Sequence, residues 1–365
     1  MEKNILLVGA GLMAKEYFRV LSDQKIPVTV IGNSEAKAKD FSDSFHVDVH
    51  IGGLESFLKK RAQGLNEFTH AIVTVGEDQA PHCVELLVQN GLKEILLEKP
   101  GAVSVQDFRE LAKKIPQEAH VFIAYNRRFY SSVQEILRLT NGGSEITSVT
   151  FEFTEWSDSI AKLNKKASMK ESWLFLNSTH VIDLAFFLGG GVETLTSIKK
   201  GSLDWHSKAS RFAGAGLSSE GVCYSYSANW DAPGRWGVEV LTKNQKYILR
   251  PLEELRIQKR NSVDFEKVDV PLADIDKKFK PGLQLQVESF LGDRRYLKTL
   301  QDQLIACDLY ETILEGGTYD RSRTQKPQPS KKLPVEEKPM EESRSPNTET
   351  SVNHDILTGD VGRSI

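Results

Sequence analysis

Short apolar runs alternate with amphipathic segments along the first third of the chain. Ile5–Val8 is wholly apolar, and the segment Leu12–Leu21 that follows it places its apolar residues at helical spacing. Strands that alternate with helices are typical of a parallel, doubly wound sheet, so we expect an α/β domain over residues 1–125. The same pattern predicts further strands at 28–31, 71–75, 95–97 and 120–124, and helices from residue 35, over 81–90 and over 105–114.

The pattern changes after residue 125. Residues 147–155 alternate between polar and apolar side chains, as a half-buried strand does. Consecutive strands of this kind favour antiparallel pairing, so we expect a second, α+β domain over residues 126–317. Its further strands are predicted at 195–199, 222–230, 236–242 and 246–251, and its helices over 173–188 and over 283–314 with a break at Gly292.

The last part of the chain has a different composition. Residues 321–346 contain five prolines, many charges and almost no large apolar side chains. Such a segment cannot bury enough surface to offset the entropy lost on ordering. We therefore expect a disordered tail over residues 318–365.

The overall composition narrows the range of partners. A net charge of −3 over 365 residues gives no basic excess, which argues against a nucleic acid or an anionic membrane surface as a partner. No apolar stretch approaches the roughly 20 residues that a membrane-spanning helix needs. The cysteines Cys83, Cys223 and Cys307 are far apart and suggest no disulfide framework. We expect a cytoplasmic protein that binds a small molecule.

One pair of histidines has a spacing that metal sites share. His46 and His50 are separated as two ligands on a helix would be. The residues between them alternate as in a strand, which would place them about 13 Å apart at roughly 3.3 Å per residue. Because no further ligand cluster accompanies them, we expect no metal site.

The turn after the first strand carries the most informative motif, Gly9-x-Gly11-x-x-Ala14. A strand–turn–helix with these small residues is typical of dinucleotide binding. Gly9 permits a tight turn, Gly11 leaves room for a pyrophosphate, and Ala14 lets the helix approach its strand. Free N–H groups at the helix N-terminus then favour phosphate binding, although a turn without a ligand is the alternative. The residues expected to hold the cofactor are Gly9, Ala10, Gly11, Leu12, Met13 and Ala14.

The end of the second predicted strand bears on the choice of dinucleotide. An acidic residue at this position binds the ribose hydroxyls and favours NAD. The chain has Asn33 and Ser34 there, with no arginine adjacent to bind a 2′-phosphate. We expect both residues to contact the cofactor, which is either NAD or NADP.

Three further motifs follow the glycine turn. They are Glu98-Lys99-Pro100, Tyr125-Asn126-Arg127-Arg128-Phe129, and His180-x-x-Asp183-Leu184 ahead of Gly189. In this order and spacing the chain resembles the glucose–fructose oxidoreductase/inositol 2-dehydrogenase (Gfo/Idh/MocA) family over residues 3–316.

The resemblance implies a fold and an activity. It implies an N-terminal Rossmann domain and a C-terminal domain with an open, mostly antiparallel sheet. The activity it implies is hydride transfer between NAD or NADP and a hydroxyl-bearing carbon of a sugar, cyclitol or sugar derivative, in sugar or surface-polysaccharide metabolism. It also implies a homo-oligomer, either a dimer or a tetramer, that associates through the second sheet.

The resemblance further assigns roles to single residues. Lys99 would face the nicotinamide and the substrate, where an ammonium can stabilise an alkoxide and exchange a proton. Glu98 would orient Lys99 or touch the cofactor. His180 would face the substrate and act in acid–base chemistry. Asn126 would bind the cofactor and Arg127 the substrate, with a structural role between the domains as the alternative.

The sequence departs from the family at one position. Many members have an aspartate one helical turn before the histidine, where this chain has Leu176. Asn177 is then expected to bind a substrate hydroxyl, while Asp183 equally suits helix packing. Either Lys99 carries more of the proton transfer or the enzyme is weak or specialised. The alternative function is a non-catalytic, dinucleotide-binding sensor or scaffold.

Overall fold

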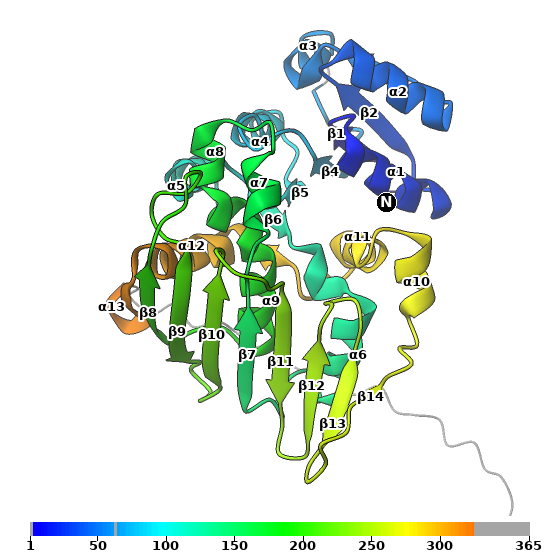
Figure 1. Ribbon diagram of the computed structural model, residues 1–365. Helices are drawn as coiled ribbons and strands as arrows, with labels where there is room; N and C mark the ends of the chain where they lie inside the picture. Colours follow the sequence, from blue (N-terminus) through cyan, green and yellow to red (C-terminus); the bar gives the residue numbers. More distant parts are fainter. Residues whose placement is uncertain (1–2, 62–63, 325–365) are drawn as a thin grey trace, which may run out of the picture. The chain divides into compact units, whose positions relative to one another are not determined.

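The first β-sheet is formed mainly by the N-terminal third of the chain (Figure 1). The structure is a computed structural model that describes residues 3–61 and 64–324. The strands lie in the order β15-β6-β5-β4-β1-β2-β3, and all neighbours are parallel except β15 and β6. In chain order the strands are β1 (Ile5–Val8), β2 (Val28–Gly32), β3 (Val49–Ile51), β4 (His70–Val73), β5 (Glu94–Glu98), β6 (His120–Ala124) and β15 (Lys298–Thr299).

The strand order reverses direction beside β1. The chain passes from β1 to β2 and β3 on one side of the sheet and then to β4, β5 and β6 on the other. In such sheets, ligands bind at this reversal, outside the carboxyl ends of the strands. The predicted parallel, doubly wound sheet is thereby confirmed. The helices that connect its strands are α1 (Leu12–Asp23), α2 (Glu35–Phe45), α3 (Gly53–Lys59), α4 (Ala80–Gln89) and α5 (Val105–Lys114).

Local signals in the sequence account for several of these helix ends. The side chain of Ser34 accepts a hydrogen bond from the backbone N–H of Lys37, and Ser104 caps α5 in the same way. Gly91 follows α4 with a φ of 88°, a conformation that favours glycine. Side chains of the central strands are fully buried because helices cover both faces, which explains why these strands read as continuous apolar runs.

The second β-sheet is mostly antiparallel, as expected. Its order is β14-β13-β12-β11-β7-β10-β9-β8-β16, and among these neighbours only β7 and β10 are parallel in the described part of the chain. The strands are β7 (Ser148–Glu152), β8 (Thr194–Lys200), β9 (Arg211–Leu217), β10 (Cys223–Asn229), β11 (Gly237–Leu241), β12 (Gln245–Leu249), β13 (Arg256–Lys259), β14 (Glu266–Lys267) and β16 (Gly317–Asp320).

Helical segments cover one face of this second sheet. The helix α9 (Thr179–Leu188) packs on β7 and β11, and α12 (Leu300–Glu315) packs on β8 and β9; both lie behind the strands in Figure 1. The other segments are the 3₁₀ turn η1 (Asn126–Phe129), the π-helical turn η2 (Leu174–Ser178), α6 (Ser131–Leu139), α7 (Ser157–Ala161), α8 (Ala167–Glu171), α10 (Ala273–Lys278), α11 (Leu283–Leu291) and α13 (Arg321–Thr324).

Strand β9 was absent from the sequence prediction, and its composition explains why. Small residues alternate along it, and Phe212 is its one large buried side chain. A Cβ atom at Gly214 would collide with the ring of Tyr226 on β10, and one at Gly216 would collide with the Thr194 carbonyl on β8. Close approach of the neighbouring strands, rather than apolar periodicity, therefore determines this strand.

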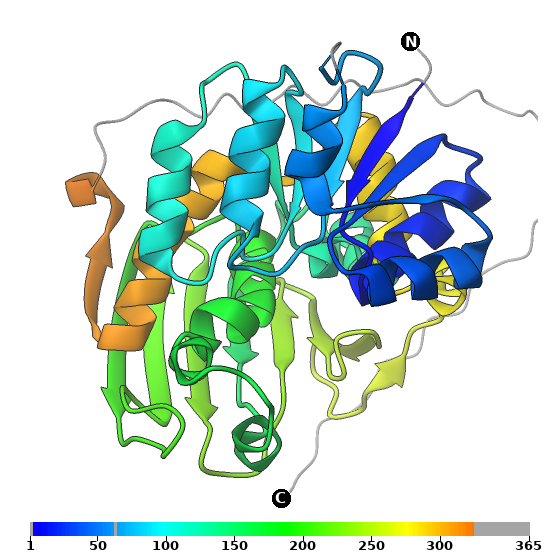
Figure 2. The ribbon, with the colours of Figure 1, turned by 90° about the horizontal axis from the view of Figure 1, so that it is seen from above.

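Part of the C-terminal half returns to the first sheet. Helix α11 packs on α1, and Figure 2 shows it, in yellow, beside the blue N-terminal elements. Leu283, Val287 and Phe290 share a core with Ile5 and Leu7 of β1. Residues 283–299, which were expected in the second domain, therefore pack with the first sheet instead.

The tail expected from residue 318 begins too early. Residues 317–320 form β16, which pairs with β8, and Tyr319 is buried there. One apolar aromatic side chain and a row of backbone hydrogen bonds are enough to attach this short edge strand. Helix α13 then extends to Thr324, and the remainder of the expected tail lies outside the described residues.

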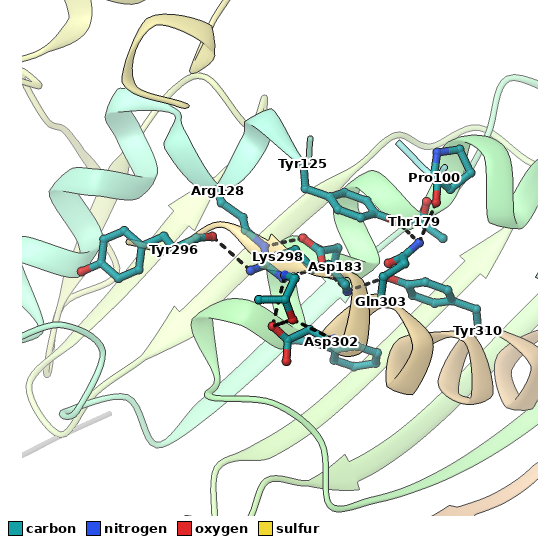
Figure 3. A network of polar contacts seen from close by, with 12 residues as sticks. Pro100, Tyr125, Arg128, Thr179, Asp183, Tyr296, Lys298, Asp302, Gln303 and Tyr310 are labelled. Atoms are coloured by element: carbon teal, nitrogen blue, oxygen red, sulfur yellow. Dashed lines mark hydrogen bonds and ion pairs between the residues drawn. The ribbon is translucent and has the colours of Figure 1, made fainter. Parts of the chain in front are cut away.

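A buried ion cluster connects the two sheets. Both oxygens of Asp183 on α9 accept hydrogen bonds from Arg128 at 2.7 Å, and Lys298 on β15 donates to Oδ1 at 2.6 Å (Figure 3). The Asp183 side chain is 1% exposed. Burial alone would raise the pKa of Asp183, but the two cations outweigh it and hold that pKa below its ordinary value.

The same network reaches the loop after β5. Gln303 on α12 donates from Nε2 to the Pro100 carbonyl at 3.1 Å and to the Tyr125 hydroxyl at 3.2 Å (Figure 3). Arg128 also donates to the Tyr296 carbonyl at 3.2 Å. The loops after β5 and β6 are thus fixed against α9, β15 and α12.

We expect Asp183→Asn to destabilise the fold strongly. The substitution keeps the shape of the side chain but leaves Arg128 and Lys298 as buried charges without a counter-ion. The free energy of unfolding in urea at pH 7 should fall by about 3–5 kcal/mol.

Asp274→Asn is the matched control. Asp274 forms an ion pair with Lys277 on the exposed face of helix α10, where solvent screens the interaction. Its urea midpoint should stay at the wild-type value. A wild-type midpoint for Asp183→Asn would contradict the structural role assigned to the cluster.

Candidate active site

A cavity of about 720 Å³ opens where β1, β4 and β5 end. It therefore lies at the reversal of the strand order. The residues that line it are Ala10, Gly11, Leu12, Met13, Lys37, Asp40, Thr74, Val75, Gly76, Glu77, Ala80, Glu98, Lys99, Asn126, Arg127, Lys165, His180 and Lys280.

The glycine turn forms one end of this cavity. A Cβ atom at Gly9, whose φ is 125°, would collide with the Thr74 hydroxyl, so the turn packs directly against the end of β4. At Gly11 no atom lies within 4 Å of an added Cβ, and no side chain caps α1 there. The open space and the free N–H groups at this helix N-terminus suit a phosphate group. Ala14 is fully buried and does not line the cavity.

A smaller pocket of about 360 Å³ adjoins the cavity, and Val75 lines both. Asn33 lies in this pocket, with Glu55 and Asp78. Ser34 lines neither space, because its side chain caps α2. The structure thus places Asn33 in a pocket beside the cavity, and it gives Ser34 a structural role as a helix cap.

Lys99 lies in the middle of the cavity wall, directly after β5. Its ammonium donates a hydrogen bond to the Leu176 carbonyl at 2.7 Å. Burial lowers the pKa of Lys99 to about 8, against the opposing effect of Glu98. A lysine with this pKa is present in both protonation states near neutral pH, so it can take up or release a proton.

Glu98 faces away from Lys99 towards α1. It accepts a hydrogen bond from the Tyr17 hydroxyl at 2.8 Å, and Tyr17 also lies 3.1 Å from Gln286 Oε1. Burial raises the pKa of Glu98, although Lys99 opposes this. Glu98 thus lines the cavity with a carboxyl group that a buried tyrosine holds in place.

The acceptor for Lys99 comes from the π-helical turn η2. The helix predicted over residues 173–188 is present, but its first part, Leu174–Ser178, is wound as a π turn. The Leu176 side chain is buried, while its carbonyl binds the ammonium. A backbone oxygen of the π-helical turn therefore serves as the acceptor for Lys99.

The buried carboxylate of Glu155 holds this turn through hydrogen bonds. Glu155 was not identified as a site residue from the sequence. It is 2% exposed and accepts hydrogen bonds from the Ser178 hydroxyl at 2.7 Å and from Asn177 Nδ2 at 3.0 Å. Asn177 consequently does not line the cavity. The signal was available, because alternation puts Glu155 on the same buried face as Phe151 and Phe153.

His180 lies one turn further along, on α9. Its Nδ1 is buried without a hydrogen-bond partner, and its ring packs against Tyr125 and Trp236, with centroids 6.2 and 5.9 Å away. Burial, followed by the charges of Arg127 and Lys99, holds the pKa of His180 well below its ordinary value. The imidazole is therefore neutral at pH 7 and can form hydrogen bonds through Nε2.

The two arginines of the third motif have different environments. Arg128 belongs to the buried ion cluster with Asp183. Arg127 lines the cavity and stacks on Trp236, with Cζ 4.9 Å from the ring centroid. Asn126 donates from Nδ2 to the Pro281 carbonyl at 2.9 Å, so its amide also braces the start of α11.

The two histidines with the spacing of metal ligands do not line this cavity. His46 ends α2 with a φ of 55°, and His50 lies on β3. In residues 3–61 and 64–324, no group of three His, Cys, Asp or Glu side chains is arranged to hold a metal ion. Over the same residues, no helix combines the length and apolarity needed to cross a bilayer.

Comparison with known proteins identifies the N-terminal domain. Residues 3–126 match the model of an oxidoreductase family with an NAD-binding Rossmann fold, GFO_IDH_MocA. No curated protein matches the chain.

Solved structures share the fold over most of the chain. An oxidoreductase from Agrobacterium radiobacter in complex with NAD⁺, L-tartaric acid and magnesium is 15% identical with a TM-score of 0.71, over 89% of this chain and 100% of that one. Levoglucosan dehydrogenase with NADH is 14% identical with a TM-score of 0.69, over 86% and 96% of the two chains. UDP-N-acetylglucosamine 3-dehydrogenase from Acidithiobacillus ferrooxidans is 12% identical with a TM-score of 0.64, over 86% and 97%.

The family match falls on the domain that carries the glycine turn, Lys99 and Asn126, and it ends where the cavity passes to the second sheet. Over residues 3–126, the chain is therefore similar to the NAD-binding Rossmann domain of the Gfo/Idh/MocA oxidoreductase family.

Proposed function

We propose that the protein is an NAD- or NADP-dependent dehydrogenase that transfers a hydride to or from a hydroxyl-bearing carbon of a sugar, cyclitol or sugar derivative. The observation that carries this proposal is the position of Lys99. Its ammonium, with a lowered pKa, lies in one cavity with the glycine turn and His180. A proton-exchanging group thus shares a continuous space with a phosphate-binding turn.

The residues present fit a dinucleotide. The space at Gly11 and the free amides of α1 would hold the pyrophosphate, and the pocket with Asn33 would hold the adenosine. When bound, the nicotinamide accepts or supplies the hydride. Leu12, which is 84% exposed, would be covered by the cofactor.

Lys99 handles the proton in this proposal. In substrate oxidation, its neutral amine takes the proton from the substrate hydroxyl, and in reduction its ammonium returns that proton to the carbonyl oxygen. The Leu176 carbonyl directs the ammonium and leaves it hydrogen-bonding capacity for the substrate. His180, being neutral, orients the hydroxyl through Nε2.

We also propose that the chain forms a homo-oligomer through the second sheet. In Figure 1 the near face of β8, β9 and β10 carries no helix among the described elements. Ile198 and Leu217 are 68% and 45% exposed on this face. A second copy of the sheet would cover these apolar side chains.

Ile198→Asp should shift this assembly towards the monomer. A carboxylate at this position on β8 would be buried without a partner in the oligomer. Size-exclusion chromatography with light scattering measures the change. An unaltered oligomer, or a wild-type chain that is already monomeric, would contradict the proposed interface.

Gly11→Ala should weaken dinucleotide binding without affecting the fold. The added methyl group meets no protein atom, but it occupies the space assigned to the pyrophosphate. We expect the Kd for NADH, measured by fluorescence titration, to rise by about tenfold or more.

Gly9→Ala provides the contrast for this experiment. Its methyl group would collide with Thr74, so this variant should lose thermal stability. Unchanged NADH affinity in a stable Gly11→Ala protein would remove the glycine turn from the binding site.

Lys99→Arg should abolish the pH dependence that Lys99 confers. With wild-type protein, kcat/KM for substrate oxidation should rise with pH and level off above about 8, because the amine accepts a proton only when neutral. A guanidinium stays protonated, so the variant should lose the rising limb and about 10²–10⁴-fold in rate.

His180→Asn tests the division of roles between the two residues. This substitution should lower kcat/KM, but kcat/KM should still rise with pH, because the rise comes from the titration of Lys99. If kcat/KM still rises with pH in Lys99→Arg, or no longer rises in His180→Asn, the proton transfer belongs to another group.

A further inference from the structure

The charge of Arg127 is not neutralised by the protein. Arg128, the next residue, is paired with Asp183, whereas no carboxylate in the described chain forms an ion pair with Arg127. Its Nε is buried without a hydrogen-bond partner. A buried or half-buried guanidinium without a counter-ion is costly, which suggests that a ligand supplies the missing charge.

Aromatic side chains hold this guanidinium in place. Its Cζ lies 4.9 Å from the ring centroid of Trp236 and 5.8 Å from that of Tyr130. The Cζ atom of Arg235 also lies over Trp236, 4.3 Å from the ring centroid, and the Arg235 guanidinium approaches Glu155 at 3.5 Å. These aromatic contacts restrain the Arg127 guanidinium, and its fork of N–H donors suits a group with two oxygens.

The rest of the cavity wall strengthens the positive potential at this end. Lys165 and Lys280 line it without forming an ion pair in the described chain, and Lys99 donates to a neutral carbonyl. The lining carboxylates Asp40 and Glu98 are engaged by Lys15 and Tyr17. Glu77 is the remaining lining carboxylate, on the turn after β4.

We propose that the substrate is an anionic sugar whose carboxylate or phosphate binds Arg127 while the reacting hydroxyl meets Lys99 and His180. This inference rests on the proposed dehydrogenase function. It names a substrate class for the site, with a uronic or aldonic acid and a sugar phosphate as the two sources of the anionic group.

The test compares substrates that differ only in the anionic group. D-glucose, D-galactose and D-mannose are each paired with the corresponding uronate and hexose 6-phosphate. Binding to the NADH-saturated protein is measured by calorimetry, and kcat/KM is measured for every sugar that is oxidised. We expect at least one anionic member to bind about 100-fold more tightly than its neutral parent. Comparison of the uronates with the hexose 6-phosphates shows whether the anionic group is a carboxylate or a phosphate.

Arg127→Met should remove this preference. The anionic ligand should lose about 100-fold in affinity, the neutral sugar should change little, and the Kd for NADH should stay constant. Arg127→Lys should restore part of the preference, because it keeps the charge without the planar fork. Arg256→Met, the same change at an exposed site on β13, is the matched control.

The outcomes separate this inference from the proposed function. If NADH does not bind, the dehydrogenase proposal fails and this one with it. If NADH binds but no anionic sugar binds more tightly than its neutral parent, the anionic substrate class is overturned while the dehydrogenase proposal stands. A loss of NADH affinity in Arg127→Met, with the preference intact, would likewise overturn the role of Arg127.

Discussion

The site depends on the desolvation of a single ammonium group. Lys99 is placed by β5 at the edge of a parallel sheet, and burial there makes its charged form expensive. One backbone carbonyl, that of Leu176, is its hydrogen-bond partner in the protein. Burial and this single hydrogen bond together leave the amine able to change protonation state near neutral pH. The surrounding residues keep the amine in this environment.

Two buried polar clusters maintain that geometry from opposite sides. Glu155 holds the π-helical turn that carries the Leu176 carbonyl. Asp183, with Arg128 and Lys298, holds α9 against β15 and the loop after β6. Removing one member of such a cluster leaves buried charge unpaired, so these residues fix the relative positions of elements that are distant in sequence.

Much of the fold followed from local patterns. Alternating strands and helices predicted the parallel sheet of the first domain, and this sheet is present as expected. Ser34, Ser104 and the glycine after α4 account for several of its helix ends. Strand β9 and the return of residues 283–299 to the first sheet were missed, because close interstrand packing and long-range docking leave no periodic signal.

Prediction of the site was less complete. The cavity brings together Gly11, Lys99, Arg127 and His180 from separate motifs. It excludes Ser34 and Asn177, whose polar side chains serve a helix cap and Glu155. Glu155 was missed because a strand pattern indicates burial through its apolar residues and not through a charged one. The Leu176 carbonyl was missed because a backbone acceptor has no signature in a sequence.

The most direct test of this account is an NMR titration of the Lys99 side chain, with its resonance assigned by comparison with a substituted protein. We expect a midpoint near pH 8. A midpoint at the ordinary lysine value of about 10.4 would show a solvated ammonium and contradict the central claim.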